Sequence, residues 1–128
     1  MKSKFYMRVG GNKETLDAFH SDASVPDSLV NELKRVAGAQ ADEDDRWFWN
    51  TPYYVCTTLF PEDELLEHLL VSHYFVNKLK LYRPKLRYVV ATIVLHLALD
   101  EKPKGFFVNE KLTAILASLG AGIEIDIT

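Results

Sequence analysis

The sequence predicts one α+β domain, in which a four-stranded, mostly antiparallel sheet carries three to five helices packed mainly on one face. Three observations lead to this prediction. Four stretches alternate apolar and polar residues, as half-buried strands do, and the stretches between them repeat apolar residues at helical spacing. The length of 128 residues matches a chain with one hydrophobic core, so residues 1–128 are interpreted as a single domain.

The N-terminal third is predicted to hold one strand and two helices. A strand is expected over Lys4–Val9, where apolar and polar residues alternate. Two glycines end this strand, and Asn12 is a good N-cap for a short helix to about Phe19. A second helix is expected over residues 27–37, because apolar residues recur there at helical spacing and Gly38 is suited to end it.

An aromatic-rich segment follows a polar, acidic loop. Residues Tyr53–Leu59 are rich in β-forming side chains and are expected to form a strand. Trp47 and Trp49 either extend this strand or lie in an adjoining hairpin. A strand that carries aromatic side chains on both faces exposes some of them unless both faces are covered.

A long helix is predicted to begin at Pro61, because proline suits the first helical turn and acidic residues follow it directly. Its apolar positions continue to about Leu81, with a break expected near Ser72, and Pro84 ends it. The longest strand is then expected over Leu86–Leu99, where β-branched residues are frequent and side chains alternate between two faces.

The C-terminal segment is predicted to be a helix followed by a closing strand. Asn109 is a suitable N-cap, apolar residues recur at helical spacing as far as Leu119, and Gly120 ends the helix. Isoleucines alternate with acidic residues over Ile123–Ile127, which indicates the strand.

Several short motifs carry a resemblance to a known family. They are a glycine turn after the first strand, a Glu-His-Leu step at 67–69, a tryptophan at the start of the second strand, and C-terminal segments at 105–112, 116–120 and 123–127. In these features the chain resembles the bacterial domain-of-unknown-function family 4279. The resemblance implies a small α+β bacterial domain. It implies no activity, because none is established for that family.

Composition excludes several classes of protein. The formal net charge of −3 gives no general attraction for nucleic acid or anionic lipid. Cys56 is the only cysteine, so a disulfide scaffold is excluded, and with no histidine beside it we expect a buried apolar side chain rather than a reactive thiolate. The first residues lack a signal-peptide core and no apolar stretch is long enough to span a bilayer, so we expect a cytoplasmic protein without membrane contact.

Three ionisable residues are candidates for catalysis. Glu64 and His68 lie four residues apart on one predicted helix and therefore share a face. Asp126 would join them only if the closing strand brought it into the same cleft. The structural alternatives are a surface pair on the helix and, for Asp126, either an exposed position or a salt bridge to Arg8 or Arg87. We favour these alternatives.

No cofactor and no metal are expected. The two glycines before the first helix lack the spacing of a phosphate-binding loop. Zinc-ligand, calcium-loop and Ser-His-Asp patterns are also absent from the sequence.

Two groups of residues are candidates for binding another molecule. The first is an aromatic and acidic set suited to a protein partner: Trp47, Trp49, Tyr53, Asp42, Glu43, Asp44 and Asp45. The second is a basic strip suited to nucleic acid: Lys78, Lys80, Arg83, Lys85 and Arg87. The structural alternatives are core packing for the aromatic residues and a solvated surface for the basic strip.

The sequence therefore predicts a non-catalytic protein-binding domain, of which an immunity- or antitoxin-like protein is one concrete form. In that form the acidic run would steer association and the tryptophans would anchor the partner. A nucleic-acid-binding or regulatory domain that uses the basic strip is the first alternative, and a small enzyme is the second. The oligomeric state is left open between monomer and homodimer.

Overall fold

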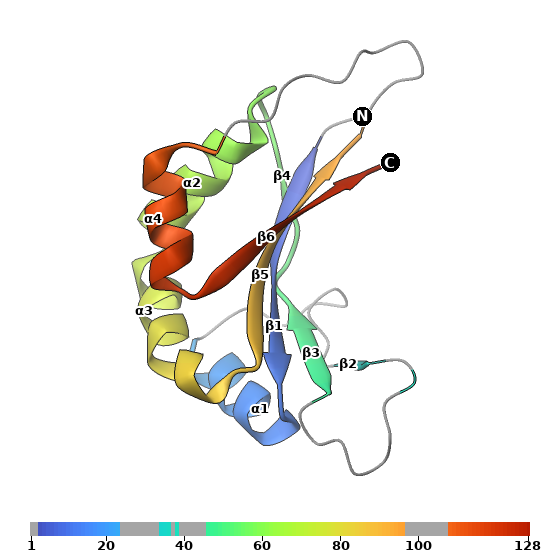
Figure 1. The fold of residues 1–128 in the computed structure, drawn as a ribbon, viewed down its shortest axis with the longest axis vertical. Helices are drawn as coiled ribbons and strands as arrows, with labels where there is room; N and C mark the ends of the chain where they lie inside the picture. Colours follow the sequence, from blue (N-terminus) through green and yellow to red (C-terminus); the bar gives the residue numbers. More distant parts are fainter. Residues whose placement is uncertain (1–2, 24–33, 37, 39–45, 97–107) are drawn as a thin grey trace.

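The computed structural model describes residues 3–23, 34–36, 38, 46–96 and 108–128. The described helices all lie against one face of a single sheet (Figure 1). This confirms the α+β class. The elements in chain order are β1 (Lys4–Gly11), α1 (Lys13–Asp22), β2 (Lys34–Arg35), β3 (Trp47–Asn50), β4 (Tyr54–Val55), α2 (Pro61–Val71), α3 (His73–Tyr82), a 3₁₀ turn (Arg83–Lys85), β5 (Tyr88–Leu95), α4 (Glu110–Ser118) and β6 (Ala121–Ile127).

The sheet differs from the prediction in strand number and direction. Its order is β2-β3-β1-β5-β6, and β4 pairs with β1 as a sixth strand. β1 pairs antiparallel with β3, β4 and β5, but β5 and β6 are parallel. The two strands beyond the predicted four are β2 and β3, and β2 has only two residues, which is too short for an alternating pattern to reveal it. β6 is parallel because α4 intervenes before it in the chain, as a crossover connection requires.

Alternation along the strands decides which residues form the core. Phe5 and Met7 on β1 are buried on the helix-covered face, and in the β1–β5 register Phe5 lies opposite the buried Ile93. Tyr6 and Thr92, which also lie opposite each other, project from the other face, named here the outer face. The predicted first strand is confirmed.

Local capping signals were predicted correctly. The side-chain carbonyl of Asn12 accepts a hydrogen bond of 2.7 Å from the Thr15 amide at the start of α1. Asn109 accepts one of 2.8 Å from the Leu112 amide at the start of α4. The predicted helix break at Ser72 is also present, between α2 and α3.

Three predicted elements differ in part from the structure. The strand expected over Tyr53–Leu59 is reduced to the two residues of β4, while Trp47–Asn50 forms β3, which pairs with the same strand β1, as expected if the tryptophans extended the strand. The helix expected over residues 27–37 lies mostly outside the described residues, but Lys34–Arg35 is extended and pairs with β3. There, ladder hydrogen bonds to a sheet edge outweigh an apolar pattern that favours a helix. Of the strand expected over Leu86–Leu99, only Tyr88–Leu95 is a strand, and residues 97–99 lie outside the described part.

Candidate functional site

The predicted aromatic patch does not form. Trp49 is only 2% exposed, because β3 turns it toward α1, where it contacts Phe19 edge-to-face at 5.8 Å. Trp47 is half-buried against the core, with the Lys13 amino group 5.5 Å from its ring centre. Tyr53 is 42% exposed and belongs to another part of the surface. The acidic residues predicted to act with them, residues 42–45, lie outside the described residues.

The basic strip is divided by contacts within the domain. The Lys78 amino group forms an ion pair of 3.0 Å with Asp22. The Arg83 guanidinium donates hydrogen bonds to the carbonyl oxygens of Leu86, Leu119 and Gly120. Lys80, Lys85 and Arg87 are exposed. At least two of the five cations therefore have structural roles.

Glu64 is a structural residue at the start of α2. Its two carboxylate oxygens accept hydrogen bonds from the backbone amides and the hydroxyl groups of Thr57 and Thr58, at 2.8 to 3.1 Å. Desolvation acts to raise the pKa of Glu64, but these hydrogen bonds outweigh it and hold the pKa below its ordinary value. The carboxylate therefore fixes the loop that joins β4 to α2.

The three candidate catalytic residues do not converge. His68 contacts Phe5, whose side chain lies on the helix-covered face of the sheet. Asp126 lies opposite Val94 in the β5–β6 register and therefore projects from the outer face, where it is exposed. The sheet separates the two side chains.

Cys56 is buried, as expected. Burial, followed by the nearby Glu64 carboxylate, raises the pKa of its thiol to about 12. A thiol with this pKa stays protonated at neutral pH and is a poor nucleophile.

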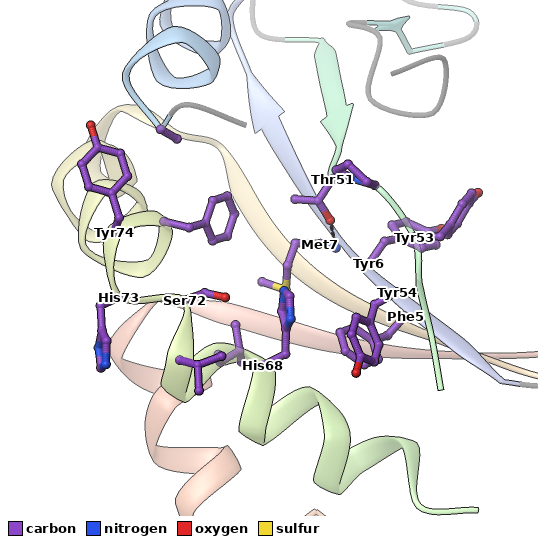
Figure 2. A pocket seen from close by; sticks show the side chains of 15 residues that line it. Phe5, Tyr6, Met7, Thr51, Tyr53, Tyr54, His68, Ser72, His73 and Tyr74 are labelled. Atoms are coloured by element: carbon purple, nitrogen blue, oxygen red, sulfur yellow. Dashed lines mark hydrogen bonds between the residues drawn. The ribbon is translucent and has the colours of Figure 1, made fainter. Parts of the chain in front are cut away.

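The surface also contains an apolar groove that was not predicted. Its volume is about 560 Å³, and it lies between β1, the segment that joins β3 to β4, and the junction of α2 with α3 (Figure 2). The buried side chains of Phe5, Met7 and Leu69 form its floor. Large exposed side chains form its rim, namely Tyr54, Val71 and Tyr74. We name this feature the aromatic groove.

One end of the aromatic groove is a cluster of rings. Phe5 stacks on Tyr54 at 4.8 Å, and the His68 ring contacts both, at 5.5 and 5.3 Å. On the outer face of the sheet, Tyr6 contacts Tyr53 edge-to-face at 5.0 Å, and the Lys4 amino group lies 4.3 Å from the centre of the Tyr53 ring. Figure 2 shows the Phe5 and Tyr54 rings close to His68, with His73 and Tyr74 on the other side of the groove.

The opposite wall is held by α1. The Tyr74 hydroxyl donates a hydrogen bond of 2.7 Å to the backbone carbonyl of Asp22. The Asp22 side chain in turn binds Lys78 and accepts a hydrogen bond of 3.1 Å from Tyr82. The hydrogen bond from Lys78 lowers the pKa of Asp22 despite some desolvation, so the pair stays charged at neutral pH. The end of α1 therefore positions the first turn of α3.

The chemistry of the aromatic groove suits binding. Partial desolvation lowers the pKa of His68, so its imidazole is neutral at neutral pH. None of the described residues that line the groove is a carboxylate or a cysteine. Within the described ranges, no three His, Cys, Asp or Glu side chains are grouped to hold a metal ion. No helix in this part of the chain is long and apolar enough to cross a membrane.

Sequence reasoning identified only Tyr53 and His68 of the groove. The remaining lining residues come from β1 and from both sides of the predicted break at Ser72, and only the folded chain brings them together. The helix break was a usable signal, since a break in an apolar face opens a gap between two helix ends.

Comparison with known proteins gives no relative: no protein-family model, no curated protein and no solved structure matches the chain. The resemblance to the bacterial domain-of-unknown-function family 4279 therefore stays a prediction drawn from the sequence motifs.

Proposed function

We propose that this domain is a non-catalytic protein-binding domain and that the aromatic groove receives apolar side chains of its partner. The observation that carries the proposal is a groove with a buried apolar floor and a rim of exposed tyrosines. Tyrosine combines a large apolar ring with a polar hydroxyl and is enriched at binding hot spots. This site replaces the tryptophan pair, because Trp49 is part of the core.

The exposed apolar surface extends beyond the groove, which favours a protein over a small ligand. Along the chain from the rim, Leu59 and Phe60 are 70% and 58% exposed. A small ligand would fill a volume of about 560 Å³ and leave these side chains in water. A protein face can cover both, and large apolar patches on a domain commonly mark such interfaces.

The loop that carries Leu59 and Phe60 is held in place. Glu64 binds the two preceding residues, Thr57 and Thr58, through four hydrogen bonds. Binding to a loop that is already ordered costs less conformational entropy than binding to a loop that must become ordered. An immunity- or antitoxin-like protein remains one concrete form of this proposal.

Two helix residues provide a matched test of the proposal. Val71 lines the groove and Leu81 does not, yet each is an apolar residue of a described helix and each is 67% exposed. A photoreactive amino acid is placed at position 54, on the groove rim, or at position 81, and the protein is irradiated in its host. We expect one distinct cross-linked protein from position 54 and not from position 81.

The cross-linked protein is then purified and its affinity is measured directly. Val71→Asp places a charge on the groove rim and should weaken binding by about tenfold or more, whereas Leu81→Asp should leave the affinity unchanged. Equal effects of the two variants, or the same cross-linked proteins from both positions, would contradict the proposal.

A further inference from the structure

β6 forms one edge of the sheet and has no strand beyond it among the described residues. It pairs with β5 in parallel along its whole length, from Ala121 opposite Val89 to Ile127 opposite Leu95. An edge strand of seven residues is long for one that faces solvent, because its unpaired backbone groups can template another strand.

The direction of the backbone groups on β6 follows from one hydrogen bond. The Thr128 amide donates to the Leu95 carbonyl at 3.0 Å, so the backbone of Thr128 is directed toward β5. Along a strand, successive residues direct their N–H and C=O groups to opposite sides. Ile123, Ile125 and Ile127 therefore direct theirs outward, away from β5.

The side chains of β6 present two chemically different faces. Ile123, Ile125 and Ile127 lie on the helix-covered face but remain 38%, 37% and 60% exposed. Glu124 and Asp126 project from the outer face and are exposed. Neither carboxylate has an ion-pair partner within the part of the chain that the structure describes.

We propose that β6 binds an extended segment of another protein in which apolar residues alternate with Lys or Arg, and that this segment adds to the sheet as an antiparallel strand. Its apolar residues lie opposite the three isoleucines, where the outward backbone groups form paired hydrogen bonds. Its cations lie opposite Glu124 and Asp126, at the positions between these hydrogen-bonded pairs, where facing side chains are closest.

Charge argues against a second copy of this chain in every register that keeps both Glu124 and Asp126 opposite residues of the second β6. A two-fold axis through Ile125 would place Glu124 directly opposite Asp126 of the second copy. An axis through Glu124 would place the two Glu124 side chains opposite each other. Like charges directly opposite are destabilising in an antiparallel pair, whereas a basic segment gains from the same positions.

Two blocked heptapeptides test the proposal on the full chain. One alternates valine with arginine, the other alternates valine with glutamate, and amide NMR spectra follow each titration. The arginine peptide should shift the Ile123, Ile125 and Ile127 amides and slow their hydrogen exchange. The amides of Glu124 and Asp126, which face β5, should be protected with or without peptide. The glutamate peptide should bind about tenfold more weakly or worse.

Charge reversal supplies the matched control. Glu124→Arg with Asp126→Arg should invert the preference, so that the glutamate peptide binds more tightly. Asp17→Arg with Glu67→Arg changes the net charge equally at exposed positions on α1 and α2 and should leave the preference unchanged. The groove variant Val71→Asp should also leave peptide binding unchanged, so this inference and the proposed function fail separately.

Three results would overturn the inference. The first is that neither peptide shifts the outward amides of β6. The second is equal affinity for both peptides, or a change in peptide preference that is the same for the β6 double variant and for the control double variant on α1 and α2. The third is protection of the outward amides in the free protein that grows with concentration while the molecular mass doubles, which would identify a second copy as the added strand.

Discussion

Nη2 of Arg83 donates a hydrogen bond of 3.0 Å to the carbonyl of Gly120, which lies 37 residues further along the chain. Nε of the same guanidinium binds the Leu119 carbonyl at 3.0 Å. Arg83 therefore fastens the end of α3 to the end of α4, where the last carbonyl groups of a helix lack partners within the helix. Gly120 allows this contact, since its φ of +57° is unfavourable for other residues and an added Cβ would lie 2.7 Å from Nε of Arg83.

We expect Arg83→Ala to lower the free energy of unfolding by about 1–3 kcal/mol, because several carbonyl groups lose a charged donor. Arg83→Lys should recover only part of this, since an ammonium group cannot reproduce the planar fork. Lys85→Ala, at an exposed position nearby, is the control. Urea denaturation of the three variants measures the difference, and equal midpoints for Arg83→Ala and Lys85→Ala would contradict the assigned role.

The loop after β4 should depend on Glu64. Glu64→Ala removes the acceptor of four hydrogen bonds and should cost about 1–2 kcal/mol of stability. Because the pKa of Glu64 is lowered in the folded state, its contribution is present above the ordinary value of 4.5 and is lost as the pH falls through the folded-state pKa. Denaturation curves at neutral and acidic pH measure both effects. Glu67→Ala, at an exposed position on the same helix, should change neither by much.

His68, which lines the aromatic groove, should make the stability of the domain depend on pH. Partial desolvation lowers its pKa, so the unfolded chain binds a proton at higher pH than the folded chain does. Stability should therefore fall as the pH drops below about 6.5 toward the folded-state pKa. His68→Gln should reduce this slope, and His73→Gln, which lies outside the ring cluster of Phe5, Tyr54 and His68, is the comparison. The free energy of unfolding is measured between about pH 7.5 and about pH 5.5. If it depended on pH as steeply in His68→Gln as in the unchanged protein, the assigned role of His68 would be wrong.

The predictable parts of this fold are those that local chemistry decides. The caps at Asn12 and Asn109 need only the residue and the three that follow it, and both are present. The alternation of Lys4–Val9 likewise identified its buried face. The parallel direction of β6 and the two-residue strands depend on distant pairing, which alternation within one segment does not encode.

The candidate site was harder to predict for the same reason. Alternation placed Trp47 and Trp49 on one face of a strand, but it could not show that α1 covers that face. The groove requires β1, the 51–54 segment and the α2–α3 junction to meet. The spacing of Glu64 from His68 indicated a shared helix face, whereas the hydrogen-bond partners of Glu64 precede it in the chain, in a segment expected to be a strand.

The tryptophans provide a direct test of this correction. Trp49 is among the largest fully buried side chains, so Trp49→Ala should cost about 3–5 kcal/mol through lost contacts and a cavity. Trp47 is only partly buried, and Trp47→Ala should cost clearly less. A soluble quencher should also reduce the fluorescence of Trp47 more than that of Trp49.

The final prediction concerns the backbone of β6. The N–H of Ile125 is directed outward, whereas that of Asp126 is directed toward β5, as the Thr128–Leu95 hydrogen bond implies. Proline is tolerated on an edge strand only where the missing N–H would face solvent. Asp126→Pro should therefore destabilise the domain by about 1–3 kcal/mol more than Ile125→Pro, since it leaves an acceptor on β5 without its donor. Thermal or urea unfolding compares the two variants. If Ile125→Pro were the more damaging one, the outward direction of the isoleucine amides would be wrong, and strand addition at this edge would lose its geometric basis.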